Sequence, residues 1–215
     1  MRYDLHIHTR NSRCSNLSPL TILKAAKKKR LDGIAVTDHN SIKGGLQVSR
    51  LNKDRDFEVI VGSEIMTNNG EVLGYYLNED IKSRDFFEVI EEIHRQGGLA
   101  VVAHPFTDGI TRKRFDLDLV KVKNMIDGVE GFNGRQFLGY KNKKVQDIAK
   151  RYYIAMVAGS DAHFWFEVGS SFTVFNGDLR RALKLRKTRL FGTTRYVFPG
   201  SFLTAVEKMK NLFKF

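Results

Sequence analysis

The chain has 215 residues, of which 36 are Lys or Arg, 24 are Asp or Glu, 42% are apolar and one is Cys. This composition excludes a disordered chain, a collagen-like repeat and a disulfide scaffold. The formal net charge of +12 at pH 7 concentrates anions and favours a phosphate-bearing partner. The sequence contains no window of 18 or more apolar residues, and no leader pattern precedes the first strand-like segment. We therefore expect a cytoplasmic protein without membrane contact.

Apolar, β-branched runs alternate with longer amphipathic segments along the chain. The predicted strands lie near residues 3–8, 33–37, 58–65, 71–77, 99–103, 128–132, 154–158 and 170–175. The predicted helices lie near residues 18–30, 43–53, 84–96, 116–125, 139–151, 178–187 and 201–212. This order is typical of parallel strands joined by right-handed crossovers, in either a doubly wound sheet or a closed α/β barrel. With no internal repeat or linker, we predict one domain over residues 1–215.

Local signals refine three of these boundaries. Ser18 before Pro19 predicts a capped helix start, and Ser201 is the predicted start of the last helix. The strands at 58–65 and 71–77 are joined by a short segment containing Asn69-Gly70, which predicts a hairpin that interrupts the alternation.

Five of the six histidines fall at or just past the end of a predicted strand, and only His94 lies inside a predicted helix. The five are His6, His8, His39, His104 and His163. In parallel α/β folds, this edge of the sheet is where sites are built. Because random placement would scatter histidines over helices and loops, we infer that these five converge.

The spacing of these residues favours a polynuclear metal centre. His6 and His8 leave one face of a strand together, and so do Asp161 and His163, while Glu64 ends the third strand. Imidazole and carboxylate groups are ligands for Zn, Mn and Fe. A Ser-His-Asp or Cys-His hydrolase does not explain five histidines, and the chain carries no nucleophile elbow, dinucleotide-binding glycine motif or phosphate-binding P-loop.

Several motifs together resemble those of the PHP (polymerase and histidinol phosphatase) superfamily. They are Asp4-Leu5-His6-Ile7-His8-Thr9, Thr37-Asp38-His39-Asn40, Gly62-Ser63-Glu64, Ala103-His104-Pro105 and Gly159-Ser160-Asp161-Ala162-His163, in the family's order. The resemblance implies an α/β fold, a distorted (β/α)7 TIM-like barrel, with two or three divalent metal ions (Zn, Mn or Fe) and phosphoesterase activity. It is closest to small stand-alone phosphoesterases that act on nucleotides or short oligonucleotides.

The resemblance also implies a set of metal ligands. The first ion would be held by His6, His8, Glu64 and Asp161, the second by Glu64 and His104, and the third by His39 and His163. Two positions depart from the family pattern. Glu71 stands where relatives have a His, and would serve the second ion as a carboxylate that favours Mn over Zn. Arg13-Cys14 stands where relatives supply an Asp or His to the third ion, so either Cys14 binds as a thiolate or Arg13 replaces the ion and holds a phosphate.

The implied mechanism is hydrolysis of a phosphate ester. Two ions bridged by Glu64 would lower the pKa of a shared water, and the bridging hydroxide would attack phosphorus. Arg135 is the predicted phosphate clamp, with Lys43 and Arg10 as weaker candidates, and His163 or a metal-bound water is the predicted proton donor.

Two further groups have predicted supporting roles. Asp38 and Asn40 flank His39 and are expected to orient it. Phe164-Trp165-Phe166 would either form an aromatic wall for a base or pack within a loop.

Two other function classes remain open from the sequence. An amidohydrolase also uses a His-x-His and a late Asp, although His163 two residues after Asp161 is a PHP feature and no bridging Lys ends a strand. A non-catalytic nucleic-acid-binding domain with a modified metal site would fit the net charge of +12 and the changes at Glu71 and Cys14. The expected partner is an anionic phosphorylated small molecule or a short oligonucleotide, and the sequence does not predict an oligomeric state.

Overall fold

The computed structural model describes residues 1–107 and 115–212. Within these residues, nine strands form one sheet in the spatial order β7-β6-β5-β4-β3-β2-β1-β8-β9. Along the chain the strands are β1 (Arg2–Ile7), β2 (Gly33–His39), β3 (Glu58–Thr67), β4 (Gly70–Tyr75), β5 (Leu99–Val102), β6 (Gly128–Asn133), β7 (Met156–Gly159), β8 (Ser171–Val174) and β9 (Arg189–Gly192). The helices are α1 (Pro19–Lys28), α2 (Lys43–Leu51), α3 (Phe86–Arg95), α4 (Leu119–Val122), α5 (Gly139–Tyr152), α6 (Leu179–Lys184) and α7 (Val197–Leu212).

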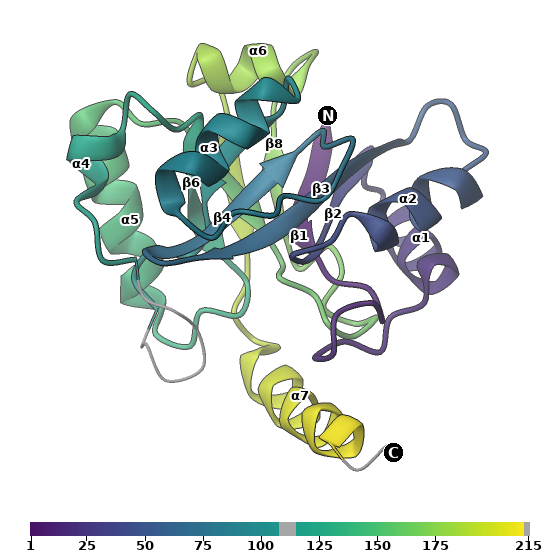
Figure 1. Ribbon diagram of the computed structural model, residues 1–215. Helices are drawn as coiled ribbons and strands as arrows, with labels where there is room; N and C mark the ends of the chain where they lie inside the picture. The colour runs from purple at the N-terminus through teal and green to yellow at the C-terminus, as the bar shows by residue number, and fades with distance from the viewer. Residues whose placement is uncertain (108–114, 213–215) are drawn as a thin grey trace.

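Six of these strands form two parallel sets that run in the same direction, which is also the direction of β9. β1, β2 and β3 pair in parallel, as do β5, β6 and β7. β4 lies between the two sets and pairs antiparallel with both β3 and β5. The carboxyl ends of the six strands and the first residues of β4 therefore share one edge of the sheet. In Figure 1 this edge faces α7, whereas α6 lies at the opposite end of the molecule.

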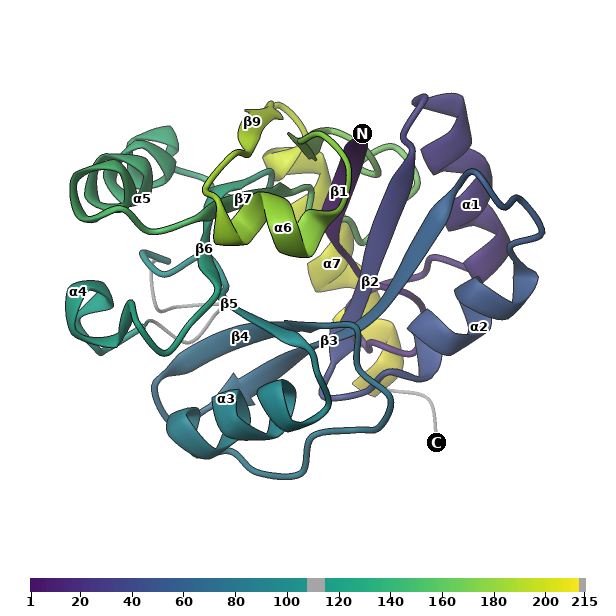
Figure 2. The same ribbon diagram turned by 90° about the horizontal axis from the view of Figure 1, so that it is seen from above.

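The sheet curls until β7 approaches β1, as the view from above shows (Figure 2). The loop after β7 bonds to β1 through two backbone hydrogen bonds, from the His8 N–H to the Ala162 carbonyl at 2.9 Å and from the Ala162 N–H to the His6 carbonyl at 3.3 Å. A Cβ atom on Gly159 would lie 2.3 Å from the Cβ of His6, so only glycine allows this close approach. The sheet is thus nearly closed, like a barrel.

This architecture corrects part of the predicted (β/α)7 TIM-like barrel. The fold is mixed α/β and barrel-like as expected, but β4 is antiparallel to its neighbours and β8 and β9 extend the sheet beyond β1 by antiparallel pairing. The hairpin joining β3 to β4 explains the departure, because a two-residue turn reverses the chain where a crossover helix would have kept it parallel.

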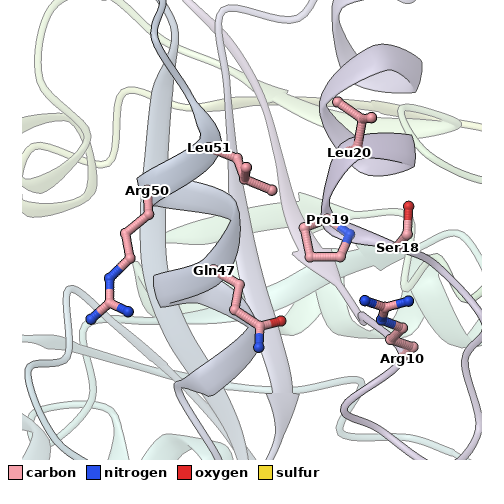
Figure 3. A pocket seen from close by; sticks show the side chains of 7 residues that line it. All are labelled: Arg10, Ser18, Pro19, Leu20, Gln47, Arg50 and Leu51. Atoms are coloured by element: carbon pink, nitrogen blue, oxygen red, sulfur yellow. The ribbon is translucent and has the colours of Figure 1, made fainter.

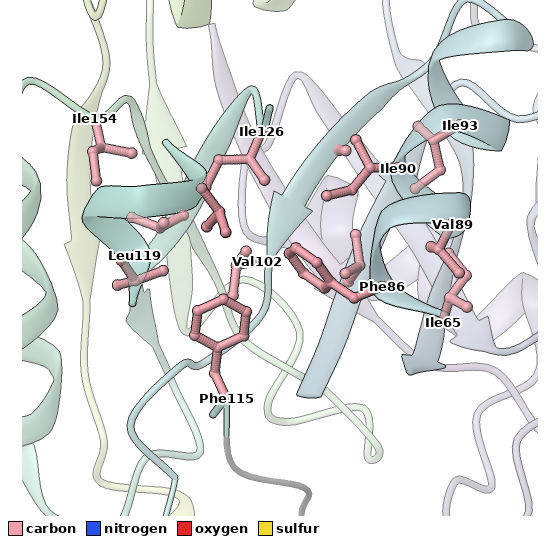
Figure 4. Packing of buried hydrophobic residues seen from close by; sticks show 14 of the residues in the cluster. Ile65, Phe86, Val89, Ile90, Ile93, Val102, Phe115, Leu119, Ile126 and Ile154 are labelled. Carbon is pink, nitrogen blue, oxygen red and sulfur yellow. The ribbon is translucent and has the colours of Figure 1, made fainter. Parts of the chain in front are cut away.

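The interior of the sheet is filled by apolar side chains away from the site edge. They include Leu5, Ile60, Leu73 and Tyr75, together with Leu179 of α6. Helices α1 to α5 lie on the outer side of the sheet, whereas α7 lies at its carboxyl-end edge. Between α3, α4 and the sheet lies the largest outer cluster, in which Phe86, Val89, Ile90 and Ile93 occupy one side of α3 (Figure 4). Both layers are needed to fix the strands whose ends form the site.

Most local predictions agree with the structure. Ser18 caps α1, since its Oγ accepts the Thr21 N–H at 3.1 Å. The hairpin turn contains Asn68 and Asn69, and Gly70 pairs with Thr67. His94 lies on α3 with its Nε2 2.8 Å from Asp127 Oδ2, as a surface histidine.

Two predicted helix boundaries were wrong, and one strand was not predicted. The last helix begins at Val197, before Ser201, because Pro199 falls in the first turn, where proline is tolerated. The helix predicted over 116–125 is helical only at Leu119–Val122. The short strand β9 was missed because four residues carry too little periodicity to detect.

Candidate metal centre

The carboxyl-end edge of the sheet brings the five strand-end histidines together around a cavity of about 850 Å³. Glu64 and His39 are register partners on β3 and β2, and His104 follows β5. Glu71 is the second residue of the antiparallel strand β4 and reaches the same edge. The residues around the cavity are Asn11, Ser12, Arg13, Cys14, His39, Asn40, Glu64, Met66, Glu71, His104, Thr107, Arg135, Gln136, Phe137, Asp161, His163, Val197, Ser201, Thr204 and Ala205.

Glu64 lies at the centre of the histidines. Its Oε1 is 2.9 Å from His104 Nε2 and 3.4 Å from His6 Nε2. Its Oε2 is 3.0 Å from His39 Nδ1 and 3.4 Å from His8 Nε2. The two oxygens of one buried carboxylate therefore face four imidazoles, which is the arrangement of a group able to bridge two cations.

The four residues proposed for the first ion lie together. His8 Nε2 is 3.3 Å and His6 Nε2 is 3.8 Å from Asp161 Oδ1, and the two Nε2 atoms are 3.1 Å apart. One donor atom each from His6, His8 and Asp161 lies within 4.8 Å of the other two. All three side chains are buried. Two imidazoles and a carboxylate at this separation fit a divalent transition metal.

The residues proposed for the second ion also converge. His104, Glu64 and His6 form one group of donor atoms, and Glu71, Glu64 and His39 form another, each with its atoms within 4.8 Å of one another. Glu71 Oε2 is 3.6 Å from His104 Nε2. The carboxylate of Glu71 thus lies close enough to His104 and Glu64 to take the place of the histidine that the family pattern has at this position.

The third group contains His8 in addition to the two histidines that the resemblance assigned to it. His39 and His163 lie with His8, whose imidazole contacts both rings at centroid distances of 4.6 and 4.5 Å. Cys14 Sγ is 3.0 Å from His163 Nε2. Arg13 is exposed and lines the cavity. The structure therefore places Cys14 within the cluster and Arg13 at its edge.

Glu130 is a buried part of the site that the sequence reasoning missed. Its Oε1 accepts a hydrogen bond from His6 Nδ1 at 2.9 Å, which directs Nε2 of His6 toward the cluster. Its Oε2 accepts from the His104 backbone N–H at 2.9 Å and from Asn133 Nδ2 at 3.0 Å. A carboxylate that orients a ligating imidazole is a common partner in metal sites. The signal available in the sequence was its position on the strand that precedes Arg135.

Asp38 supports the histidines through Ser12. Its carboxylate accepts hydrogen bonds from the Thr9 N–H at 2.7 Å and the Ser12 Oγ at 2.6 Å. The Ser12 hydroxyl in turn accepts the His39 N–H at 3.1 Å. Asn40 instead bonds to the Met66 backbone N–H through its Oδ1 at 3.0 Å. Asp38 thus acts on His39 indirectly, and Asn40 bonds to the backbone of β3.

Three site residues have a left-handed backbone although they are not glycine. The φ angles are 54° for Asn40, 22° for His104 and 56° for Asp161. Such a conformation costs about 1–3 kcal/mol per residue and concentrates at functional sites. The strain at His104 and Asp161 indicates that the positions of their side chains are enforced by the surrounding fold.

The carboxylates of the site control the charge of its histidines. Burial alone would lower the pKa of His6, but the carboxylates of Asp161, Glu130 and Glu64 outweigh it and raise that pKa well above 6.5. Burial raises the pKa of Glu64, yet His6 and His39 hold it well below its usual value. The centre therefore carries buried negative charge that positive charge must balance.

His163 is in the opposite state. Burial, followed by the positive charge of Arg135 and then of His8, holds its pKa well below 6.5, so the ring is neutral at pH 7. Its Nδ1 lies 2.8 Å from the Asp161 carbonyl oxygen and donates to it. The lone pair of a neutral ring is then on Nε2, the atom that faces Cys14. This state suits a metal ligand better than a proton donor.

Arg135 lines the cavity and is held in place. Its Nε is 3.1 Å from Glu167 Oε1, and its Nη2 donates to Thr204 Oγ1 of α7 at 2.8 Å. Glu167 also accepts the backbone N–H groups of His163 at 2.8 Å and Phe164 at 3.0 Å. The guanidinium is thus fixed beside the histidine cluster, the place required of a phosphate clamp.

The weaker clamp candidates do not line this cavity. Arg10 lies in a separate hollow of about 460 Å³ between α1 and α2, with Ser18, Pro19, Leu20, Gln47, Arg50 and Leu51 (Figure 3). Lys43 lines neither hollow.

The aromatic wall predicted from Phe164-Trp165-Phe166 is also not part of the cavity lining. The ring of Phe166 stacks on Phe164 and contacts Trp165 and Tyr196 instead. These three residues therefore pack within a loop, and Phe137 is the aromatic residue that lines the described cavity.

Two relatives and one family model match the sequence of this chain. The chain is 44% identical over 147 residues to an uncharacterised protein of Methanocaldococcus jannaschii, which covers 62% of this chain and 82% of that protein. A second uncharacterised protein of that organism is 33% identical over 180 residues, covering 82% of this chain and 71% of the relative. Residues 139–188 match a family model described as PHP-associated. Over this segment the chain is similar to PHP-associated domains, in agreement with the resemblance of the strand-end motifs to those of the PHP superfamily.

Solved structures share the PHP fold at low sequence identity. A two-domain Bacteroides vulgatus protein, described as containing a predicted PHP-like metal-dependent phosphoesterase, superposes with a TM-score of 0.76 at 17% identity, covering 94% of this chain and 69% of the other. A Chromobacterium violaceum amidohydrolase gives 0.61 at 16% identity, covering 88% and 97%. A lesion-specific endonuclease of Pyrococcus furiosus gives 0.60 at 18% identity, covering 88% and 58%. No helix among residues 1–107 and 115–212 is long and apolar enough to cross a membrane.

Proposed function

We propose that this protein is a metal-dependent phosphoesterase that hydrolyses a phosphate ester of a nucleotide or short oligonucleotide. The observation that carries the proposal is the Glu64 carboxylate, whose two oxygens face His104, His6, His39 and His8 at 2.9 to 3.4 Å. No structural need for packing explains a buried carboxylate surrounded by imidazoles with a cavity in front of it. A centre for two or more divalent cations explains all three features.

The residues divide into groups that would hold separate ions. His6, His8 and Asp161 form the first group, and Glu64 shares the second with His104 and Glu71. His39, His163 and Cys14 would complete a third. Divalent ions bound in such groups lower the pKa of a coordinated water and neutralise charge on phosphoryl oxygens.

The protein's own side chains supply orientation and charge. Glu167 and Thr204 occupy Nε and one Nη2 hydrogen of Arg135, which leaves its other N–H groups available for a phosphoryl oxygen beside the cluster. Glu130 fixes the ring orientation of His6. Because His163 is neutral with its Nε2 lone pair toward the site, we assign it to metal binding and not to proton donation.

The nucleotide part of the proposal rests on the net charge of +12 and on the fold shared with the Pyrococcus furiosus endonuclease. The fold shared with the Chromobacterium violaceum amidohydrolase supports a second candidate, hydrolysis of a C–N or C–O bond. The position of Arg135 at the cavity favours the phosphate ester, because a planar guanidinium binds phosphoryl oxygens in pairs.

The test is an assay of protein purified without chelator and loaded with Mn²⁺, Zn²⁺ or Fe²⁺. Substrates are p-nitrophenyl phosphate, bis(p-nitrophenyl) phosphate, a nucleoside 3′,5′-bisphosphate, a short oligonucleotide and a panel of cyclic amides and lactones. We expect turnover of a phosphate ester that falls about a hundredfold or more in Glu64→Gln. The matched control is Glu58→Gln at the other end of β3, where the carboxylate bonds to the Tyr3 hydroxyl at 2.6 Å.

Two results would overturn the proposal. Turnover confined to the amide or lactone panel would support the amidohydrolase. Salt-sensitive binding of the oligonucleotide without hydrolysis by any metal-loaded form would support a binding domain.

A further inference from the structure

The C-terminal helix α7 forms one wall of the cavity. Val197, Ser201, Thr204 and Ala205 of this helix line it. Figure 1 shows α7 across the end of the molecule where the site lies, away from α6. In Figure 2, seen from the opposite end, the helix passes behind β1 and β2. Whatever enters the cavity must therefore pass beside this helix.

Buried polar contacts fix α7 in this position. Thr204 accepts a hydrogen bond from Arg135, which pairs with the fully buried Glu167. A Cβ atom at Gly200 would lie 1.9 Å from Glu167 Oε1, so α7 approaches the Arg135–Glu167 pair as closely as a bare backbone permits. The side of α7 that faces the cavity is thereby determined, and so is the side that remains exposed.

Three exposed aromatic rings lie beside the cavity, one between β6 and α5 and two on α7. Phe137 lines the cavity and is 55% exposed, and its ring centroid is 4.9 Å from that of Phe198, which is 72% exposed. Phe202 is 70% exposed and lies four residues after Phe198, one turn further along the same side of α7. The three residues form a row that begins inside the site; we call it the aromatic row.

We propose that Phe137, Phe198 and Phe202 form a stacking platform for the bases of a single-stranded nucleic acid that runs into the cavity. The inference rests on the proposed function, because the cavity would hold the phosphate next to the stacked bases. Flat rings at successive helical turns suit bases, which all present a π-face. The net charge of +12 complements a polyanionic strand. Continuity of the row with the cavity favours this occupant over a second copy of the chain.

Binding without catalysis tests the platform. Fluorescence anisotropy of a fluorescein-labelled oligothymidylate is measured at low salt with EDTA, so that the strand is not cut. We expect Phe198→Ala and Phe202→Ala each to weaken binding about tenfold. Phe198→Trp should retain wild-type affinity because the larger ring still stacks. The control is Leu185→Ala, a 48% exposed apolar side chain that follows α6 at the far end of the molecule, and it should bind as the wild type does.

The outcomes separate this inference from the proposed function. Unchanged affinity in both alanine variants would overturn the platform, even if metal-loaded protein hydrolyses p-nitrophenyl phosphate. Loss of affinity in those variants would support the platform even if no phosphate ester were hydrolysed, and the proposed function would fail alone. If light scattering shows a dimer that Phe202→Ala dissociates while oligothymidylate binding is unchanged, the row is a contact between copies and the platform is wrong.

Discussion

Replacing Glu130 by Gln should weaken divalent metal binding by about 10- to 100-fold while the protein stays folded. Glu130 is fully buried and accepts three hydrogen bonds, from His6 Nδ1 at 2.9 Å, the His104 N–H at 2.9 Å and Asn133 Nδ2 at 3.0 Å. Glutamine has the same shape, but one of its two terminal groups is a donor. Either His6 Nδ1, or the His104 N–H together with Asn133 Nδ2, must then face an NH₂ group where it now faces a carboxylate oxygen.

The structure decides which face changes. If the NH₂ group faced His104 and Asn133, two buried donors would lose their acceptor, at about 1–3 kcal/mol each. If it faced His6, only one bond would have to change, because the neutral ring can accept at Nδ1 by moving its proton to Nε2. The second orientation is cheaper. It places a hydrogen on the Nε2 atom that lies 3.1 Å from His8 Nε2 and 3.4 Å from Glu64.

A protonated Nε2 cannot bind a cation, so His6 leaves the donor set until the tautomer is reversed. Reversing the tautomer breaks the new hydrogen bond between the glutamine NH₂ group and His6 Nδ1. A 10- to 100-fold loss of metal affinity corresponds to about 1.4–2.7 kcal/mol. Titration calorimetry of the chelator-stripped protein with Mn²⁺ and Zn²⁺ measures the affinity, and circular dichroism checks the fold. Glu58→Gln is the control, since its carboxylate lies at the start of β3. A folded Glu130→Gln variant with wild-type affinity and stoichiometry would refute the tautomer argument.

Three further predictions concern the ions and the core. Mn²⁺ or Zn²⁺ at about 100 times its Kd should stabilise the fold by about 2.7 kcal/mol, and EDTA should reverse the rise in thermal midpoint; equal midpoints with and without metal would argue against a centre. Cys14→Ala should weaken Zn²⁺ binding more than Mn²⁺ binding in titrations, because Cys14 Sγ lies 3.0 Å from His163 Nε2 and a sulfur ligand prefers the softer ion; equal affinities would remove Cys14 from the site. Phe86→Ala removes one ring from the apolar cluster under α3 and should lower the free energy of urea unfolding by about 3–5 kcal/mol, while metal stoichiometry stays unchanged.

The sequence predicted the cluster well because strand order and site chemistry point to the same edge. His6, His39 and His163 are far apart in the chain, yet each follows or ends a strand of the parallel set, so direction alone brings them together. Glu130 could not be found in this way. Its role depends on a contact with His6 across 124 residues, and a carboxylate within a strand carries no local sign of which imidazole it will meet.

Glu71 shows how an irregular element can still supply the site. The alternation of strands and helices suggested parallel strands, in which a ligand would come from a carboxyl end. β4 runs the other way, so its first residues reach the edge instead, and Glu71 lies opposite Met66, two residues beyond Glu64. The resemblance to the PHP motifs identified Glu71, and the hairpin predicted at Asn69-Gly70 already makes the strand that carries it antiparallel.

The charge balance of the buried cluster explains why so many histidines surround so few acids. Glu64 and Asp161 are buried, and a buried carboxylate is costly unless a positive charge compensates it. Without a metal ion that charge must come from protons, which is why the pKa values of His6 and His39 lie well above 6.5. A cation replaces those protons and leaves the rings neutral, so proton and metal compete for the same nitrogen atoms. The same compensation can thus keep the fold intact with either occupant.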